Sequence, residues 1–242
     1  MNMKKGIFIV LLLLINFSIL SAQTESSVGK FSVIPRIGVA ISNLTNNSIS
    51  TFREGDGSVV LNSKAKAGFV GGLDAEYRVS ENFALGLGAY YAQQGFRYPD
   101  YAVLDASADN ANQVFHYTGI HDHHANLHYL NVPLYVKGYL IEGLAVMAGI
   151  QFGFYINSNE MYEATDVLKN KDGSMTYGKT TKYDFDTNYQ KLECSIPVGL
   201  SYEYQNVILD ARYHIGLSHV VDWSDSMKNK TITISVGYRF AL

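Results

Sequence analysis

Apolar residues occupy every second position along much of the chain after residue 22. A period of two is typical of β-strands, in which successive side chains point to opposite faces. Leu85, Val132 and Ile234 are examples of these apolar positions. Eight segments show the alternation: 31–42, 66–78, 82–96, 127–140, 143–156, 189–204, 206–217 and 229–242. We therefore expect eight strands and an all-β fold.

Most charged residues within these segments avoid the apolar faces. The opposite faces include five acids and five bases: Arg36, Asp74, Glu76, Arg78, Lys137, Glu193, Glu203, Asp210, Arg212 and Arg239. A soluble barrel would place its charges outside, whereas a charge that faces lipid at mid-depth costs about 2–4 kcal/mol. The pattern predicts an eight-stranded, antiparallel, up-and-down transmembrane β-barrel whose lumen holds these ten residues as a paired charge network.

The connections between the segments alternate between long and short. Segments 43–65, 97–126 and 157–188 are long, whereas 79–81, 141–142 and residue 205 are short. Outer-membrane barrels have long extracellular loops and short periplasmic turns. The alternation therefore predicts that both termini lie on the periplasmic side.

Three prolines conflict with the strand assignment. Pro35, Pro133 and Pro197 each lie inside a predicted strand, where proline removes a hydrogen-bond donor from the ladder. Bulges or bends in the strands are two ways to accommodate them.

The N-terminus has the pattern of a secretory signal peptide. Lys4 and Lys5 precede an apolar run over 6–20, and Ser21 and Ala22 form a small-residue cleavage region. A retained membrane anchor is the alternative, but it needs about 20 apolar residues. We expect a cleaved signal peptide over 1–22 and one barrel domain over 23–242.

The remaining composition excludes several kinds of function. The formal net charge is −3, which gives no basic face for nucleic acid. Cys194 is the only cysteine, so it forms no internal disulfide. The chain has no nucleophile elbow, metalloprotease helix motif or glycine-rich phosphate loop. Ser218, His219 and Asp222 are close in sequence, but a triad is defined by its geometry. We expect neither an enzyme nor a cofactor.

The second long connection is rich in histidine. His116, His121, His123, His124 and His128 are five of the seven histidines in the chain. Neutral imidazoles at short spacing bind zinc, copper or nickel, so His121, His123 and His124 are candidate metal ligands. The alternative, which we favour, is a solvated polar loop without the fixed geometry that a metal site needs.

Three stretches, at 68–96, 128–140 and 198–220, resemble the small outer-membrane β-barrel family that includes porin-like and PorT-like proteins. The resemblance implies a fold and a location in the outer membrane of a Gram-negative-type cell, but no single activity. The C-terminus is similar to the signal read by the outer-membrane insertion machinery, through Ser235, Gly237, Phe240 and Leu242. It departs from the commonest form because it ends in leucine rather than in the aromatic residue.

Barrel size limits the expected function. Eight strands leave an interior that side chains fill, so a general pore is not expected. We expect a surface interaction or structural protein, surrounded by outer-membrane lipid, whose long loops contact a partner such as an envelope or secretion-system protein. The alternative is a narrow transporter, or a binder of a small ligand or metal that uses the histidine-rich loop.

Overall fold

The computed structural model describes residues 28–53, 57–104 and 115–242, so the signal segment expected at 1–22 lies outside the described residues. No helix within these ranges is long and apolar enough to cross a membrane. The described residues form these strands: β1 (Phe31–Leu44), β2 (Ser48–Arg53), β3 (Gly57–Asn62), β4 (Lys64–Arg78), β5 (Phe83–Arg97), β6 (Tyr101–Leu104), β7 (Phe115–Ile141), β8 (Leu144–Lys169), β9 (Met175–Phe185), β10 (Leu192–Tyr204), β11 (Val207–Val221), β12 (Ser224–Tyr238) and β13 (Phe240–Ala241).

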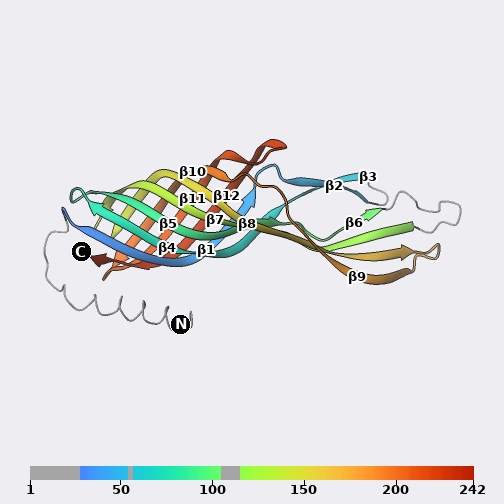
Figure 1. Cartoon of the computed structure of the whole chain (residues 1–242). Helices are drawn as coiled ribbons and strands as arrows, with labels where there is room; N and C mark the ends of the chain where they lie inside the picture. The colour runs from blue at the N-terminus through green and yellow to red at the C-terminus, as the bar shows by residue number, and fades with distance from the viewer. Residues whose placement is uncertain (1–27, 54–56, 105–114) are drawn as a thin grey trace, which may run out of the picture.

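Eight of these strands close into a ring, which confirms the predicted fold. The order around the ring is β1, β4, β5, β7, β8, β10, β11 and β12, and all the pairings are antiparallel. β12 returns to pair with β1, and β13 extends that contact. Figure 1 shows the C-terminus and the start of β1 at the same end of the barrel, beside the short turns.

Short turns at this end contain residues with positive φ. Gln205 and Asn206 have φ of 48° and 67°, as a two-residue hairpin turn requires. Gly143 has φ of 77° in the turn between β7 and β8. These tight turns keep sequential strands adjacent around the ring.

Apolar side chains cover the outside of the barrel. The side chains of Leu85 and Ile234 are 49% and 50% exposed on the outer surface of the barrel. The preceding residues on the same strands, Ala84 and Thr233, are buried. Val132 on β7 is partly buried on the same outer face. The outer surface is therefore the lipid-facing surface, and the polar face of each strand is enclosed.

Each of the three prolines lies beside a gap in one ladder. The β1 pairings with β13 and β12 stop at Val33 and resume at Arg36, on either side of Pro35. The β5–β7 and β8–β10 ladders are interrupted at Pro133 and Pro197 in the same way. The register is the same on both sides of each gap, so the prolines cost local hydrogen bonds and require no bulge.

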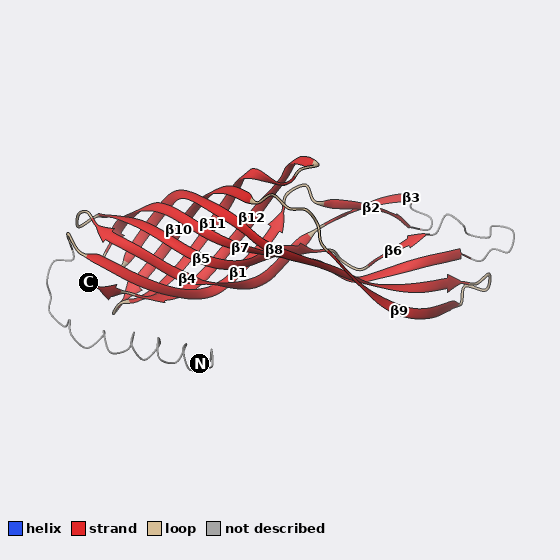
Figure 2. Ribbon diagram, viewed as in Figure 1, coloured by secondary structure: helices blue, strands red, loops and turns tan. Residues whose placement is uncertain are grey.

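The barrel strands continue into an extracellular sheet. β7 and β8 are 27 and 26 residues long and pair far beyond the ring, with β6 on the outer side of β7 and β9 on the outer side of β8. β2 and β3 form a separate hairpin next to β6. Figure 2 shows this part projecting from one end of the barrel.

This extracellular sheet corrects the expectation of loops. Segments 43–65, 97–126 and 157–188 are long connections, as predicted, but they contain much of β7 and β8 and all of β2, β3, β6 and β9. Alternation of apolar and polar residues identifies strands that have one apolar face. The side chains of β9 are exposed on both faces, so its sequence lacks that alternation.

Candidate functional site: the enclosed lumen and the extracellular sheet

Four buried charged residues form the centre of the lumen. Arg36 Nε donates to Asp74 Oδ2 at 2.7 Å, and Arg212 Nη2 donates to the same oxygen at 3.0 Å. Arg212 Nε donates to Asp210 Oδ1 at 2.7 Å, and Arg36 Nη1 lies 3.4 Å from Asp210 Oδ2. Their side chains are at most 5% exposed. Two arginines and two aspartates thus neutralise each other and link β1, β4 and β11.

A second cluster surrounds Glu76, closer to the periplasmic end of β4. Its carboxylate accepts hydrogen bonds from Tyr135 Oη at 2.9 Å, from Arg239 Nη2 at 2.8 Å and from Lys137 Nζ. Arg239 Nε also donates to Glu203 Oε1 at 2.8 Å. Arg36 Nη2 lies 3.9 Å from Glu76 Oε1, so the two clusters form one network.

Two of the ten predicted lumen charges lie outside this network. Arg78 is at the periplasmic rim, where its guanidinium lies 3.5 Å from the centroid of the Tyr139 ring and donates to the Glu81 carbonyl oxygen at 2.7 Å. Glu193 is buried nearer the extracellular end and accepts from Asn229 Nδ2 at 3.1 Å. In the described ranges, no ion pair joins Glu193 to a basic residue.

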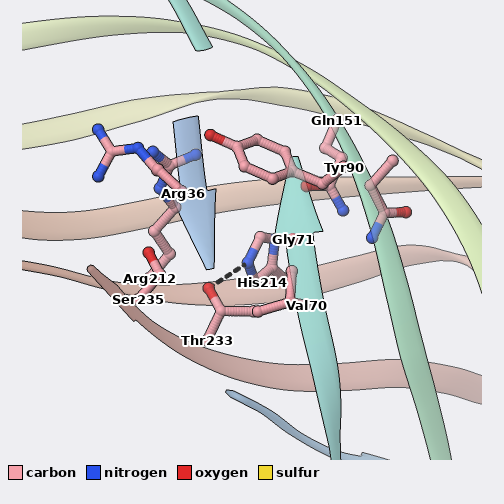
Figure 3. A pocket seen from close by; sticks show the side chains of 10 residues that line it. Arg36, Val70, Gly71, Tyr90, Gln151, Arg212, His214, Thr233 and Ser235 are labelled. Carbon is pink, nitrogen blue, oxygen red and sulfur yellow. Dashed lines mark hydrogen bonds between the residues drawn. The ribbon is translucent and has the colours of Figure 1, made fainter. Parts of the chain in front are cut away.

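A small cavity lies in the lumen beside these ion pairs. A cavity of about 20 Å³ is lined by Arg36, Tyr90, Arg212, His214 and Thr233 among others, and Figure 3 shows these side chains around it. His214 Nε2 and Thr233 Oγ1 are 3.1 Å apart. A cavity of this size holds about one water molecule.

An apolar cluster covers the lumen at its extracellular end. Its buried members are Leu44, Phe96, Tyr98, Ala125, Leu127, Tyr129, Tyr189, Val220 and Val221. They come from the extracellular ends of β1, β5 and β11, from β7 and from segments beyond the ring. Tyr98 Oη donates to Asn47 Oδ1 at 2.6 Å, which anchors the cluster to the connection before β2. We call this cluster the apolar plug.

Next to the apolar plug, a buried carboxylate joins the plug to the extracellular sheet. Glu160 Oε1 is 3.2 Å from His123 Nε2, and Glu160 Oε2 accepts from Thr187 Oγ1 at 2.8 Å and from Tyr189 Oη at 3.3 Å. Burial raises the pKa of Tyr98 well above its usual value, and the nearby Glu160 carboxylate raises it further. A tyrosine hydroxyl is already protonated at neutral pH, and the raised pKa of Tyr98 extends its role as a donor to Asn47 to more alkaline pH.

The structure gives the three candidate metal ligands different neighbours. His121 Nδ1 lies 3.2 Å from Asp100 Oδ2, His123 contacts Glu160, and His124 Nδ1 lies 3.1 Å from Asp122 Oδ1. All three are on β7 rather than in a loop, and Asp122 has φ of 48° at a break in the β7–β8 register. Within the described residues, no three His, Cys, Asp or Glu side chains are grouped as metal ligands.

Ser218, His219 and Asp222 also have separate partners. Ser218 Oγ accepts from the Cys194 backbone N–H at 2.8 Å, and Asp222 Oδ1 accepts from Gln190 Nε2. His219 Nδ1 lies 3.9 Å from Asp225 Oδ1. These contacts do not form the nucleophile, base and acid chain of a catalytic triad.

The residues of the predicted assembly signal lie where the barrel closes. Ser235 and Gly237 on β12 pair with Gly38 and Arg36 on β1. Phe240 pairs with Val33, and the Leu242 backbone N–H donates to the Phe31 carbonyl oxygen at 2.9 Å.

A closed eight-stranded barrel with an apolar exterior and buried ion pairs defines an integral outer-membrane protein. The chain belongs to the outer membrane protein beta-barrel domain family, whose model matches residues 21–222. This match confirms the resemblance to small outer-membrane barrels, and the family indicates the outer membrane of Gram-negative cells as the location. A comparison with curated proteins found no match.

Solved structures that are similar to this chain include three bacterial proteins. Ail, the attachment invasion locus protein of Yersinia pestis, is 16% identical, with 88% of this chain and 99% of Ail covered and a TM-score of 0.41. Neisserial surface protein A (NspA) is 14% identical, with 89% and 97% covered and a TM-score of 0.37. The outer membrane protein OprG from Pseudomonas aeruginosa is 13% identical, with 89% and 99% covered and a TM-score of 0.36.

Proposed function

We propose that this protein is a non-conducting outer-membrane barrel that binds a partner through its extracellular sheet. One structural relationship carries the proposal: β7 and β8 continue from a filled barrel into a projecting sheet. The lumen holds a network of eight charged side chains and a cavity of about 20 Å³, under the apolar plug. A filled barrel serves as an anchor, whereas the projecting sheet is available to other molecules.

The surface of the extracellular sheet supports a role in binding. All eleven residues of β9 are exposed, and β9 pairs with β8 alone among the described strands. Its exposed apolar side chains include Met175, Tyr177, Tyr183 and Phe185, which are 40–67% exposed. Clustered exposed apolar side chains, and aromatic ones in particular, are typical of binding surfaces.

Envelope or secretion-system proteins are the partners that the sequence resemblance implies. The protein performs no catalysis in this proposal, because Ser218, His219 and Asp222 each have a separate partner. The N-terminal 22 residues serve as a cleaved signal peptide. The barrel enters the membrane through the insertion machinery, which reads the strand that ends in Phe240 and Leu242.

Single-channel recording in planar lipid bilayers tests the proposal against a narrow transporter. The filled lumen predicts no stable conductance from the refolded full chain. A matched variant, Arg212→Ala, removes the guanidinium that bonds to Asp74 and Asp210 and enlarges the cavity. We expect the variant to stay closed as well, because the apolar plug still covers the lumen. Stable unitary conductance of the unmodified protein would overturn the proposal.

A further inference from the structure

A groove lies between the β2–β3 hairpin and the extracellular sheet. Its volume is about 620 Å³, within the range of roughly 300–1,000 Å³ that is usual for small-molecule sites. The hairpin contributes Thr51, Val59 and Leu61 to the lining. The sheet contributes residues of β6, β7, β8 and β9. None of the charged residues of the lumen network lines this groove, so the groove is separate from the barrel interior.

Two features give the groove its shape. Thr51 Oγ1 on β2 donates to the Ala102 carbonyl oxygen on β6 at 2.5 Å, which holds the hairpin beside the sheet. Gly119 on β7 lines the groove. A Cβ atom at Gly119 would lie 3.3 Å from His121 Nε2 and 3.8 Å from Val167 Cγ2. Because Gly119 has no side chain, the groove is deeper between His121 and Val167 than it would be with any other residue at this position.

The chemistry of the lining selects a class of ligand. Tyr101, Tyr117 and Tyr177 come from three different strands, and they share the lining with the aliphatic side chains of Val59, Leu61 and Val167. Aromatic side chains pack favourably against the face or edge of another ring. Asp100, His121 and Lys169 add polar groups to the lining. Asp100 Oδ2 lies 3.2 Å from His121 Nδ1, and both of these side chains are at least half exposed.

We propose that this groove binds a small aromatic molecule that carries a hydroxyl or amino group. The ring lies among the tyrosine and aliphatic side chains, above Gly119. The hydroxyl or amino group donates a hydrogen bond to the Asp100 carboxylate. This inference deepens the proposed function and rests on it in one respect, namely that the extracellular sheet is the binding part of the molecule.

Equilibrium dialysis of the full chain in lipid nanodiscs, with 2-naphthol as the probe, tests the inference. Empty nanodiscs measure how much 2-naphthol partitions into the lipid, and this amount is subtracted from the binding measured with protein. The unmodified protein is expected to show one saturable site per chain. Gly119→Val places methyl groups in the groove and is expected to weaken binding about tenfold or more. Asp100→Ala removes the acceptor and is expected to weaken binding several-fold, by about 1 kcal/mol for one hydrogen bond.

Gly138→Val is the matched control, because Gly138 is on the same strand and its added Cβ would have no neighbour closer than 3.7 Å. This control is expected to bind 2-naphthol like the unmodified protein, and heat-modifiable gel mobility shows that each variant is folded. Absence of a saturable component above empty nanodiscs would overturn the inference, as would equal binding by folded Gly119→Val. Neither result affects the bilayer recordings, so failure of the groove and failure of the proposed function are distinguishable.

Discussion

Arg36 on β1 and Asp74 on β4 form an ion pair that is completely enclosed in the barrel, with 2.7 Å between Nε and Oδ2. Asp74 Oδ2 also accepts from Arg212 at 3.0 Å. The Asp74 carboxylate therefore pairs with two buried guanidinium groups at once. Buried charges are costly unless each has a partner, so the effect of a substitution here depends on what it leaves unpaired.

Asp74→Asn is predicted to destabilise the barrel by about 3–5 kcal/mol, because it leaves Arg36 and Arg212 without one of their acids. Urea unfolding of protein refolded into lipid vesicles measures the change in the free energy of unfolding. Asp172→Asn is the control, since Asp172 lies in an exposed turn and bonds only locally to Ser174. A loss below about 1 kcal/mol for Asp74→Asn would contradict the role assigned to the network.

Gly86→Ala is predicted to destabilise the protein through a clash with a lumen tyrosine. A Cβ atom at Gly86 would overlap the ring of Tyr135, whose hydroxyl donates to Glu76 at 2.9 Å. Overpacking of this kind costs about 1–3 kcal/mol. Urea unfolding in lipid vesicles measures the loss of stability. Gly138→Ala serves as the control, because an added Cβ atom at Gly138 would meet no atom within 3.6 Å.

A second substitution separates the clash from an effect on the backbone. Tyr135→Ala alone loses the ring and its hydrogen bond to Glu76. In the double variant with Gly86→Ala, the added methyl group no longer meets the ring, so the two effects are predicted to be non-additive. Additive losses in free energy would show that Gly86 has a different role.

The barrel was predictable from sequence because its strands have two chemically different faces. Leu85 and Ile234 alternate with enclosed positions, and Asn206 in the turn between β10 and β11 is a residue type that two-residue hairpin turns favour. Lipid outside and ion pairs inside impose this alternation on every strand of the ring. β9 is exposed on both faces, and the outer part of β7 lies beyond the ring, so the two-faced pattern of the barrel strands marks neither segment.

The sequence was less informative about which residues meet. It placed ten charges on the polar faces but did not assign Asp74 to Arg36 and Arg212, because such pairs depend on the stagger between strands. The apolar plug was missed for a similar reason, since Tyr98, Tyr129 and Tyr189 come from distant segments. The histidine spacing suggested candidate metal ligands, and in the structure His121, His123 and His124 each contact a different acid.

A positive charge on the lipid-facing surface is predicted to be much more harmful than one on the extracellular sheet. Leu85→Arg places a guanidinium on the outside of β5 and should cost about 2–4 kcal/mol if this position lies near mid-depth in the bilayer. Val103→Arg is the matched control, because Val103 is 41% exposed on β6 in the extracellular sheet. Folding yield into lipid vesicles and urea unfolding measure both variants. Equal effects would contradict the assignment of the apolar exterior to lipid.

Titration with Zn²⁺ or Cu²⁺ tests whether the candidate histidines form a metal site. We predict no stoichiometric binding by the folded chain, because His121, His123 and His124 each contact a different acid and point to no shared centre among the described residues. A structural zinc site needs four ligands in tetrahedral geometry, and reaching it here would require the break in the register of β7 to rearrange. Isothermal titration calorimetry compares the unmodified chain with a variant in which all three histidines are alanine. One equivalent of bound metal that disappears in this variant would contradict the prediction and establish the metal site that the histidine spacing suggests.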